Sequence, residues 1–519
     1  ASIGTLEANT SHTDGSDNDR TSLLHDNNIS ISYASTDNET ENDSSSSKLD
    51  INNQHRKKKE EEEVFSEIIC DELNQITKLA IPVIGTYVLE MLPGVIALIL
   101  VGQIQSDSTK EYIDAAAIAI MFINLTALSI GLRLASAMDT LCSQAYGANE
   151  IRKMGIFLQT GMIVLLVTYF FVFFVAFYAA EILIALGQPE RISRLAGAYI
   201  LHLLPGIPFL YFYELLRKII QSQNIVTPRL YIAIGGNVVN NIFGYYLIYY
   251  SSDGSGEPWW LGAAVSSMAC EIMFLMFMMI YLYASDSWKL FWTGWDLSAA
   301  CRGIPQFVSL GFPGTLQLCF EWWAFEILVL LCGLLPDAQV LIGANAILVN
   351  IMSLSYMFYY GISVACSTRI GNALGAGSAN RASAAAKLSL GLACIMSILL
   401  GAALFVFRSG NAEIGEYCST LLYLVALFQF PDAINATVQG IFGGSGRQAL
   451  GAKMNFVAYY LVGLPLAITL AFHFHQNLKG LWIGMTLSLF LMAAVGTFIT
   501  VCRTDWNKLV NDAQDRVND

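Results

Sequence analysis

The stretch SQAYGAN (143–149) has a counterpart, GNALGAG (371–377), 228 residues further along the chain. Two further pairs recur at offsets close to this one: WLG (260–262) with WIG (482–484), and IIQSQN (219–224) with IFGGSGR (441–447). Three matches at nearly one spacing indicate that the chain contains two copies of one unit.

Apolar windows of about 20 residues recur from residue 79 onward, the length that a helix needs to cross ~30 Å of hydrocarbon. The whole sequence is 55% hydrophobic and 13% charged, a composition typical of polytopic membrane proteins. Twelve membrane spans are predicted: 79–102, 114–136, 156–179, 194–216, 230–250, 260–283, 306–335, 340–366, 386–407, 416–443, 454–472 and 480–501.

Each copy therefore contains six spans, and an even number brings both copies into the membrane from the same side. The predicted fold is an all-α polytopic membrane protein whose two six-helix lobes are related by a pseudo-twofold axis along the membrane normal. Transporters with this arrangement alternate access to a central cavity by rocking one lobe against the other. The predicted domains are an acidic disordered tail (1–78), a first lobe (79–283), a linker (284–305), a second lobe (306–502) and a C-terminal tail (503–519).

The charge distribution predicts the orientation of the spans. Fourteen Lys and Arg residues lie on the side of the even-numbered loops and the C-terminal edge, against five on the opposite side. The positive-inside rule then places both termini and the linker in the cytosol. In the N-terminal tail, DRTSLL (Asp19 to Leu24) fits an acidic dileucine signal that binds sorting adaptors, or is a chance match in an acidic segment. The host membrane is expected to be the plasma membrane or that of an acidic organelle.

Several classes of partner and chemistry are not expected. No basic domain is present to bind nucleic acid. The ten cysteines are scattered singly, and no nucleophile–base or metal-ligand spacing indicates an enzyme, a cofactor or a metal site. The expected partners are the lipid bilayer and a small organic substrate, and the protein is expected to act as a monomer.

CFEWWAFE (319–326) places Glu321 and Glu326 in the seventh predicted span. A carboxylate at mid-bilayer costs at least ~2.5 kcal/mol, so it is normally protonated, paired or in contact with water. The two residues lie about 140° apart around a helix. We therefore expect one to face the central cavity and the other to lie within its own lobe, unless Pro313 and Gly314 bend the helix. Trp322 either attracts an organic cation to its ring face or fills the core.

Further polar residues are expected around these acids. Asp432 and Asn435 in the tenth span lie three residues apart and share a helix face. The eighth span adds Asn350 and Tyr356. Acids that are crowded in a low dielectric hold a proton near neutral pH and release it when a cation approaches. The sequence thus predicts a proton and cation site in the second lobe, formed by Glu321, Glu326, Asp432 and Asn350.

The first lobe offers Glu90 in the first span and Asn124 in the second, and both are expected to line the central cavity. Histidine is not expected to carry the coupling proton, because His202 is the one histidine within a predicted span.

Five motifs in order resemble the eukaryotic branch of the multidrug and toxic compound extrusion (MATE) family: SAMDTLCSQAYGA (136–148), CFEWWAFE (319–326), STRIGNALGAG (367–377), DAINATVQGIFGGSGRQALGA (432–452) and LKGLWIG (478–484). The similarity covers about residues 75–503. It implies a V-shaped cavity between two lobes and the export of organic cations or other amphipathic compounds in exchange for protons.

In this resemblance the family's second-lobe site falls on Glu321, Glu326, Asp432 and Asn350. Asn124 matches an asparagine of the family's second helix, whereas Glu90 stands where glutamine is common. Arg133, near the inner end of the second span, is an unusual charge for the family. Two alternatives stay open: an exporter of organic anions or neutral conjugates, and a receptor or channel without coupled flux.

Overall fold

The computed structural model describes residues 46–104, 106–251, 259–336, 338–410 and 416–518. The chain divides into two compact units, residues 1–62 and 63–519, and the second contains every contact discussed below. The DRTSLL segment lies outside the described residues.

All regular secondary structure in the described residues is helical. The first repeat comprises α1 (Ser46–Gly102), α2 (Thr109–Ile123), the π-helix η1 (Asn124–Leu128), α3 (Ser129–Leu134), α4 (Ala137–Gly147), α5 (Ile151–Phe177), α6 (Ala179–Ala185), α7 (Glu190–Leu203), the 3₁₀ turn η2 (Leu204–Gly206), α8 (Ile207–Ser222), α9 (Thr227–Tyr250) and α10 (Gly262–Ala284). The linker and second repeat comprise α11 (Trp288–Phe291), α12 (Leu297–Cys332), α13 (Ala338–Gly375), α14 (Ala379–Gly410), α15 (Glu416–Ser445), α16 (Gln448–Phe456), η3 (Val457–Gly463), α17 (Leu464–Ile468), η4 (Thr469–His473), α18 (Asn477–Phe498), η5 (Ile499–Arg503) and α19 (Trp506–Asn518).

Eleven helical segments among the described residues are long and apolar enough to cross a membrane. They coincide with eleven of the twelve predicted spans, and the all-α polytopic fold is confirmed. The remaining prediction, 230–250, coincides with α9. Its asparagines Asn237, Asn240 and Asn241, together with several glycines, lower its hydropathy, so this span stays a prediction.

Helix α1 begins before the first predicted span. Glu72 is fully buried and forms an ion pair with Arg369 of α13 at 2.7 Å. Ile76 and Val83 pack in a hydrophobic cluster with residues of α13, α14 and α15, whereas Val101 packs with the first repeat. The predicted disordered tail over 1–78 is therefore too long, because its last residues are fixed by this ion pair and by apolar packing.

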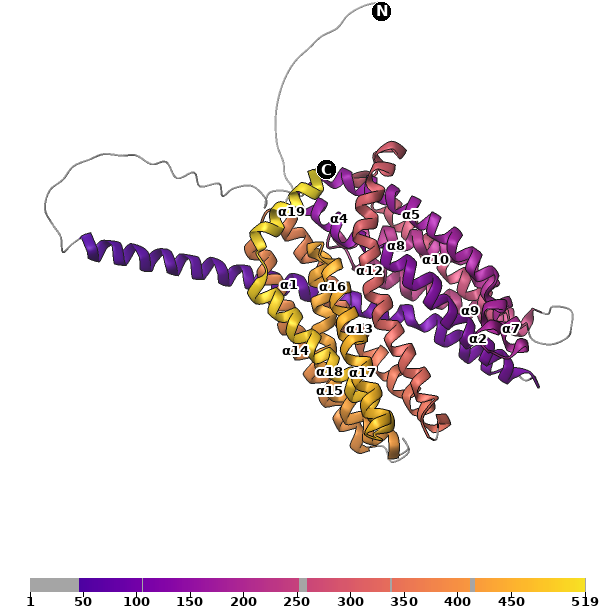
Figure 1. Ribbon diagram of the computed structural model, residues 1–519. Helices are drawn as coiled ribbons and strands as arrows, with labels where there is room; N and C mark the ends of the chain where they lie inside the picture. Colours follow the sequence, from indigo (N-terminus) through magenta and orange to yellow (C-terminus); the bar gives the residue numbers. More distant parts are fainter. Residues whose placement is uncertain (1–45, 105, 252–258, 337, 411–415, 519) are drawn as a thin grey trace, which may run out of the picture. The chain divides into compact units, whose positions relative to one another are not determined.

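Helix α12 also begins earlier than predicted. It starts at Leu297, inside the predicted linker, where the Asp296 carboxylate accepts a hydrogen bond from the Ala299 amide at 2.9 Å. Such an N-cap satisfies a backbone donor that the helix itself leaves free. In Figure 1, α12 lies between a group formed by α5, α8 and α10 and a group formed by α13, α14, α15 and α18.

The two copies of the glycine motif meet each other. A Cβ atom on Gly147 would lie 2.1 Å from the carbonyl oxygen of Asn372, and one on Gly375 would lie 2.0 Å from that of Gln144. Gly375 and Asn372 are the counterparts of Gly147 and Gln144 at the offset of 228 residues. The contact is therefore reciprocal, as an approximate twofold relation between the repeats requires, and glycine is needed because the backbones of α4 and α13 touch.

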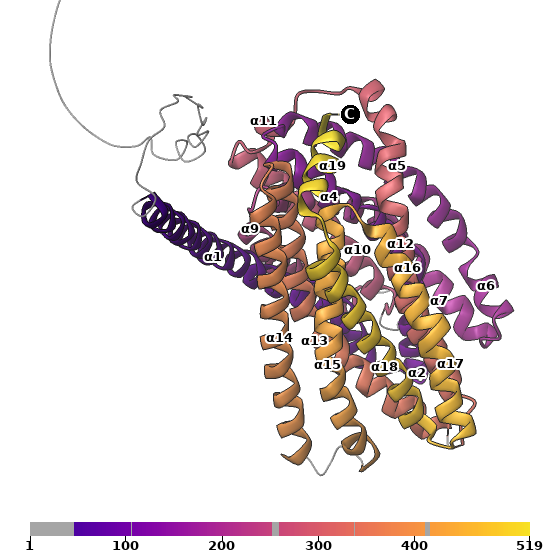
Figure 2. The ribbon, with the colours of Figure 1, turned by 60° about the vertical axis from the view of Figure 1, so that its left-hand side comes forward.

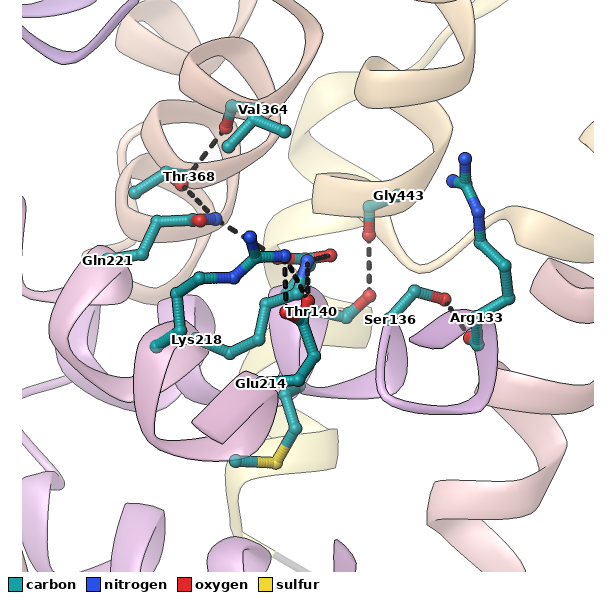
Figure 3. A network of polar contacts seen from close by, with 12 residues as sticks. Arg133, Ser136, Thr140, Glu214, Lys218, Gln221, Val364, Thr368 and Gly443 are labelled. Carbon is teal, nitrogen blue, oxygen red and sulfur yellow. Dashed lines mark hydrogen bonds and ion pairs between the residues drawn. The ribbon is translucent and has the colours of Figure 1, made fainter. Parts of the chain in front are cut away.

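Hydrogen bonds around this contact are reciprocal as well. Gln144 Nε2 donates to the Gly444 carbonyl at 3.1 Å, and its counterpart Asn372 donates through Nδ2 to the Ser222 carbonyl at 3.1 Å. In Figure 3, Thr140 donates to the Gly443 carbonyl on one side, and Gln221 donates to Thr368 on the other. The repeats are thus joined by paired polar contacts at the end of the molecule where α4 meets α13.

The C-terminal helix α19 spans this junction, and Figure 2 shows it near α4 and α13. Arg516 donates to Gln144 Oε1 of the first repeat at 2.8 Å. Lys153 of α5 donates to the Val517 carbonyl. Burial lowers the pKa of Arg516 from its usual value. The predicted C-terminal tail is therefore an ordered helix that binds both repeats.

Candidate substrate and proton site

The two acids of α12 line one cavity. It has a volume of about 280 Å³, and its lining residues are Glu321, Trp322, Phe325, Glu326, Val349, Met352, Ser353, Tyr356, Met357 and Asp432. We call it the acidic cavity. All its residues come from α12, α13 and α15, so it lies within the second repeat.

Glu321 and Glu326 both reach the acidic cavity, although they lie about 140° apart around the helix. The expectation that one of them faces the central cavity between the lobes stays a prediction, because the acidic cavity lies within the second repeat. The intervening residues Trp322 and Phe325 face it as well, so the cavity covers that whole arc of α12. Glu321 is 5% exposed and accepts a hydrogen bond from Gln439 Nε2 at 3.0 Å, whereas Glu326 is exposed.

Asp432 approaches the same cavity from α15, directly after the helix-interior Pro431, and is 4% exposed. Asn435, three residues further on, is buried but does not line the cavity. Among the described residues its Nδ2 has no hydrogen-bond partner. Tyr356 of α13 lines the cavity as expected.

Asn350 does not join the acids. It is exposed and absent from the cavity lining, to which Val349, Met352 and Ser353 of the same helix contribute. Residue 350 lies 100° around the helix from residue 349, which turns it away from this wall. The predicted four-residue cluster thus reduces to three acids with Tyr356 and Ser353.

Two candidates from the first repeat lie apart from the acidic cavity. Asn124 begins the π-helix η1, a distortion common at functional sites. Glu90 is ion-paired with Arg217 of α8 at 2.9 Å and accepts a hydrogen bond from the Tyr213 hydroxyl at 3.1 Å. Neither residue lines the acidic cavity.

The ion pair of Glu90 belongs to a buried charge network in the first repeat. Arg217 also pairs with Glu214, and Lys218 pairs with Asp139 at 2.6 Å and with Glu214 at 3.7 Å. Glu214, Arg217 and Lys218 are buried, whereas Glu90 and Asp139 are partly exposed. Figure 3 shows Glu214 and Lys218 side by side in this network.

A second, smaller cavity of about 50 Å³ adjoins the acidic cavity at Tyr356, which lines both. Arg133 and Ser136 of the first repeat line it together with Gln317, Ser367, Gln439 and Gln448 of the second, among others. We call it the inter-repeat cavity. No sequence pattern marked these glutamines, although Gln439 lies seven residues after Asp432, two turns along one face of α15.

Comparison with known proteins agrees with this architecture. The MatE family model matches residues 82–246 and 313–469, which is more than half of the chain. The chain belongs to the MatE family. Members of this family are multidrug and toxin extrusion transporters rather than enzymes, and this chain is an integral membrane protein of that kind.

Among similar MatE proteins, Multidrug and toxin extrusion protein 1 of Danio rerio is 31% identical over 450 residues, which cover 85% of this chain and 74% of that protein. Protein DETOXIFICATION 16 of Arabidopsis thaliana is 31% identical over 454 residues, covering 86% of this chain and 91% of that protein. The crystal structure of the eukaryotic MATE transporter AtDTX14 superposes with a TM-score of 0.79 at 28% identity, covering 87% of this chain and 100% of that one.

The two segments matched by the MatE model show which acid of the first repeat corresponds to which acid of the second. The segments begin at Pro82 and Pro313, and Glu90 and Glu321 each follow eight residues later. Their partners, Arg217 and Gln439, lie 222 residues apart, the offset seen in the surrounding motifs. Corresponding acids therefore have different partners, a guanidinium in the first repeat and an amide in the second.

Proposed function

We propose that this chain is a proton-coupled antiporter that exports organic cations by alternating access, with Glu321, Glu326 and Asp432 exchanging protons for cargo. One observation carries this proposal. Within the described part of the chain, the three acids line one cavity and none of them has an ionic partner. The acids Glu90, Glu214 and Asp139 of the first repeat, by contrast, are all ion-paired.

A carboxylate enclosed by protein and lipid needs a counter-charge. For Glu90, Glu214 and Asp139 of the first repeat, arginine and lysine supply that charge. No lysine or arginine lines the acidic cavity, so there a bound proton or a cationic ligand would supply it. Binding of either one removes the need for the other, which is the condition for exchange.

The walls of the acidic cavity support a cation with an apolar body. Trp322, Phe325 and Tyr356 line it together with Val349, Met352 and Met357. Aromatic faces attract cations within about 6 Å, and methionine side chains adapt to varied shapes. The cavity volume of about 280 Å³ is close to the lower end of the range for small-molecule sites, about 300–1,000 Å³.

The orientation and the host membrane belong to the same proposal. The surplus of Lys and Arg on one side supports cytosolic termini, and a cytosolic C-terminal helix α19 would put the α4–α13 junction that it contacts on the cytosolic side. An antiporter of this kind would serve the plasma membrane or the membrane of an acidic organelle.

Flux through proteoliposomes tests the proposal. With an imposed pH gradient, the full chain should accumulate a labelled aromatic quaternary ammonium ion, and collapse of the gradient with a protonophore should stop it. Glu321→Gln should lower the coupled rate at least tenfold. The control Glu190→Gln, in an exposed ion pair with Arg194, should transport like the wild type. Flux of the cation without any dependence on the gradient would indicate a channel and refute the proposal.

A further inference from the structure

The guanidinium of Arg133 faces the inter-repeat cavity without an ionic partner among the described residues. Its carbonyl accepts a hydrogen bond from Ser136, and its guanidinium lies over the ring of Tyr360 at 5.2 Å. Figure 3 shows the side chain extending away from the charge network around Lys218 and Glu214. This arginine therefore presents its donors to the cavity.

Unused polar atoms surround the same space. Gln317 Nε2 and Ser367 Oγ are buried and have no hydrogen-bond partner within the described residues, and both residues line the inter-repeat cavity at 6% exposure. Buried donors are normally paired, and leaving one unpaired costs about 1–3 kcal/mol. The acceptor Gln448 Oε1 is unpaired as well. Among the described residues, the cavity wall thus holds three unused polar atoms beside a guanidinium that forms no salt bridge.

The acid in the cavity wall does not cancel the charge of Arg133. Asp139 lines the cavity, but its carboxylate is bound by Lys218 at 2.6 Å and by Gln221 Nε2 at 3.1 Å. Gln439 also lines the cavity, and its amide donates to Glu321 of the acidic cavity. A guanidinium and two unpaired donors remain, the groups that bind a carboxylate.

We propose that the inter-repeat cavity is a subsite for the carboxylate of a zwitterionic substrate whose cationic, apolar part occupies the acidic cavity. This deepens the proposed function and rests on it. Tyr356 lines both cavities, so they adjoin, and the two charged parts of one substrate would lie on either side of this residue. The volume of about 50 Å³ suits a small group, because a cavity of roughly 10–15 Å³ by the same measure holds one water molecule.

The subsite also distinguishes the repeats. Arg133 comes from α3 of the first repeat, whereas Gln317 and Ser367 come from α12 and α13. The carboxylate would therefore bridge the two repeats at their junction, while the cationic part binds within the second repeat. A substrate that carries both charges would contact more of the site than a simple cation does.

Equilibrium binding to the full chain in nanodiscs tests this proposal with a matched pair of probes, N-benzyl-3-carboxypyridinium and its 3-carboxamide. The probes share the cation and the ring and differ in one charged group. For the wild type, the carboxylate should bind at least about tenfold more tightly, as expected for a charge-assisted hydrogen-bonded pair. Arg133→Gln should bring the ratio of dissociation constants to about one, and Arg133→Lys should retain part of it.

A second variant addresses folding. Gln317→Leu removes one unpaired donor at similar volume and should lower the ratio two- to threefold, with thermal unfolding checked for each variant. A wild-type ratio near one overturns the proposal. So does an Arg133→Gln ratio equal to that of the wild type while both affinities shift together, since Arg133 would then affect both probes alike. The ratio of dissociation constants is measured without a pH gradient. A failure of coupled flux would therefore refute proton-coupled antiport without deciding whether the carboxylate subsite exists.

Discussion

At the scale of single residues, Glu90 and Glu321 differ in their partners. Arg217 pairs with Glu90 as a cation, and Gln439 donates to Glu321 as a neutral amide. Arg217 is 5% exposed and contacts Glu90 and Glu214, while its guanidinium lies 5.1 Å from the centre of the Tyr87 ring. Gln439 gives Glu321 one neutral donor. The first repeat thus carries a network of paired charges, whereas Glu321 of the second repeat has no salt bridge among the described residues, as the proposed exchange requires.

Arg217→Gln should destabilise the protein strongly, because the partly buried Glu90 and the buried Glu214 would both lose this ionic partner. Removing one partner of a buried ion pair costs about 3–5 kcal/mol. Thermal unfolding of the purified protein measures the loss, and Glu90→Gln combined with Arg217→Gln should recover part of it. Arg194→Gln, at the exposed Glu190 pair, is the control with little expected effect. Equal melting temperatures for Arg217→Gln and Arg194→Gln would contradict a structural role for the network.

At the scale of helices, the contact between α4 and α13 sets how closely the repeats approach. Gly147→Val would place side-chain atoms where the Asn372 carbonyl lies 2.1 Å from the added Cβ. The helix itself should persist, but the junction could not close, so we expect transport to fall at least tenfold. The initial flux rate measures this effect.

Gly391→Val in α14 is the matched control, because a Cβ there meets nothing within 4 Å. Its rate should equal that of the wild type. A normal rate for Gly147→Val would show that the repeats need not approach this closely during transport.

The helices and their repeat were largely predictable, because span length and motif spacing depend on local sequence alone. The 228-residue offset predicts which glycines correspond, and the structure shows that these residues meet. Element ends were less predictable. The buried pair of Glu72 with Arg369 and the Asp296 cap extend α1 and α12 beyond their apolar windows, and such contacts leave no hydropathy signal.

The site was predictable in its acids and less so in their surroundings. Glu321, Glu326 and Asp432 stand out because carboxylates are rare in apolar spans. Asn350 was wrongly assigned to the site. Each residue turns a helix by 100°, and local sequence does not show which face of α13 lines the acidic cavity. The ion pair of Glu90 with Arg217 and the donors around Arg133 join distant parts of the chain, so spacing could not reveal them.

At the scale of the whole molecule, the repeats have the same helical plan but different charge states. Reciprocal contacts at the α4–α13 junction hold them together, and Arg516 of α19 donates both to Gln144 of the first repeat and to the Ser445 carbonyl of the second. The acidic cavity lies within the second repeat, and the inter-repeat cavity lies where the repeats meet. Rocking of the repeats would therefore change the shape of the inter-repeat cavity most. The acids of the acidic cavity would keep their positions relative to one another, because they all lie on helices of the second repeat.

Proton release on cation binding tests the central claim most directly. Purified protein in weakly buffered solution with a pH indicator is titrated with tetraphenylphosphonium near neutral pH. The wild type should release about one proton per bound cation, as linkage between two exchanging ligands requires. The double variant Glu321→Gln, Asp432→Asn should release none. Saturable binding to the wild type with no proton release, or undiminished release from the double variant, would contradict the exchange of protons for cargo at these acids.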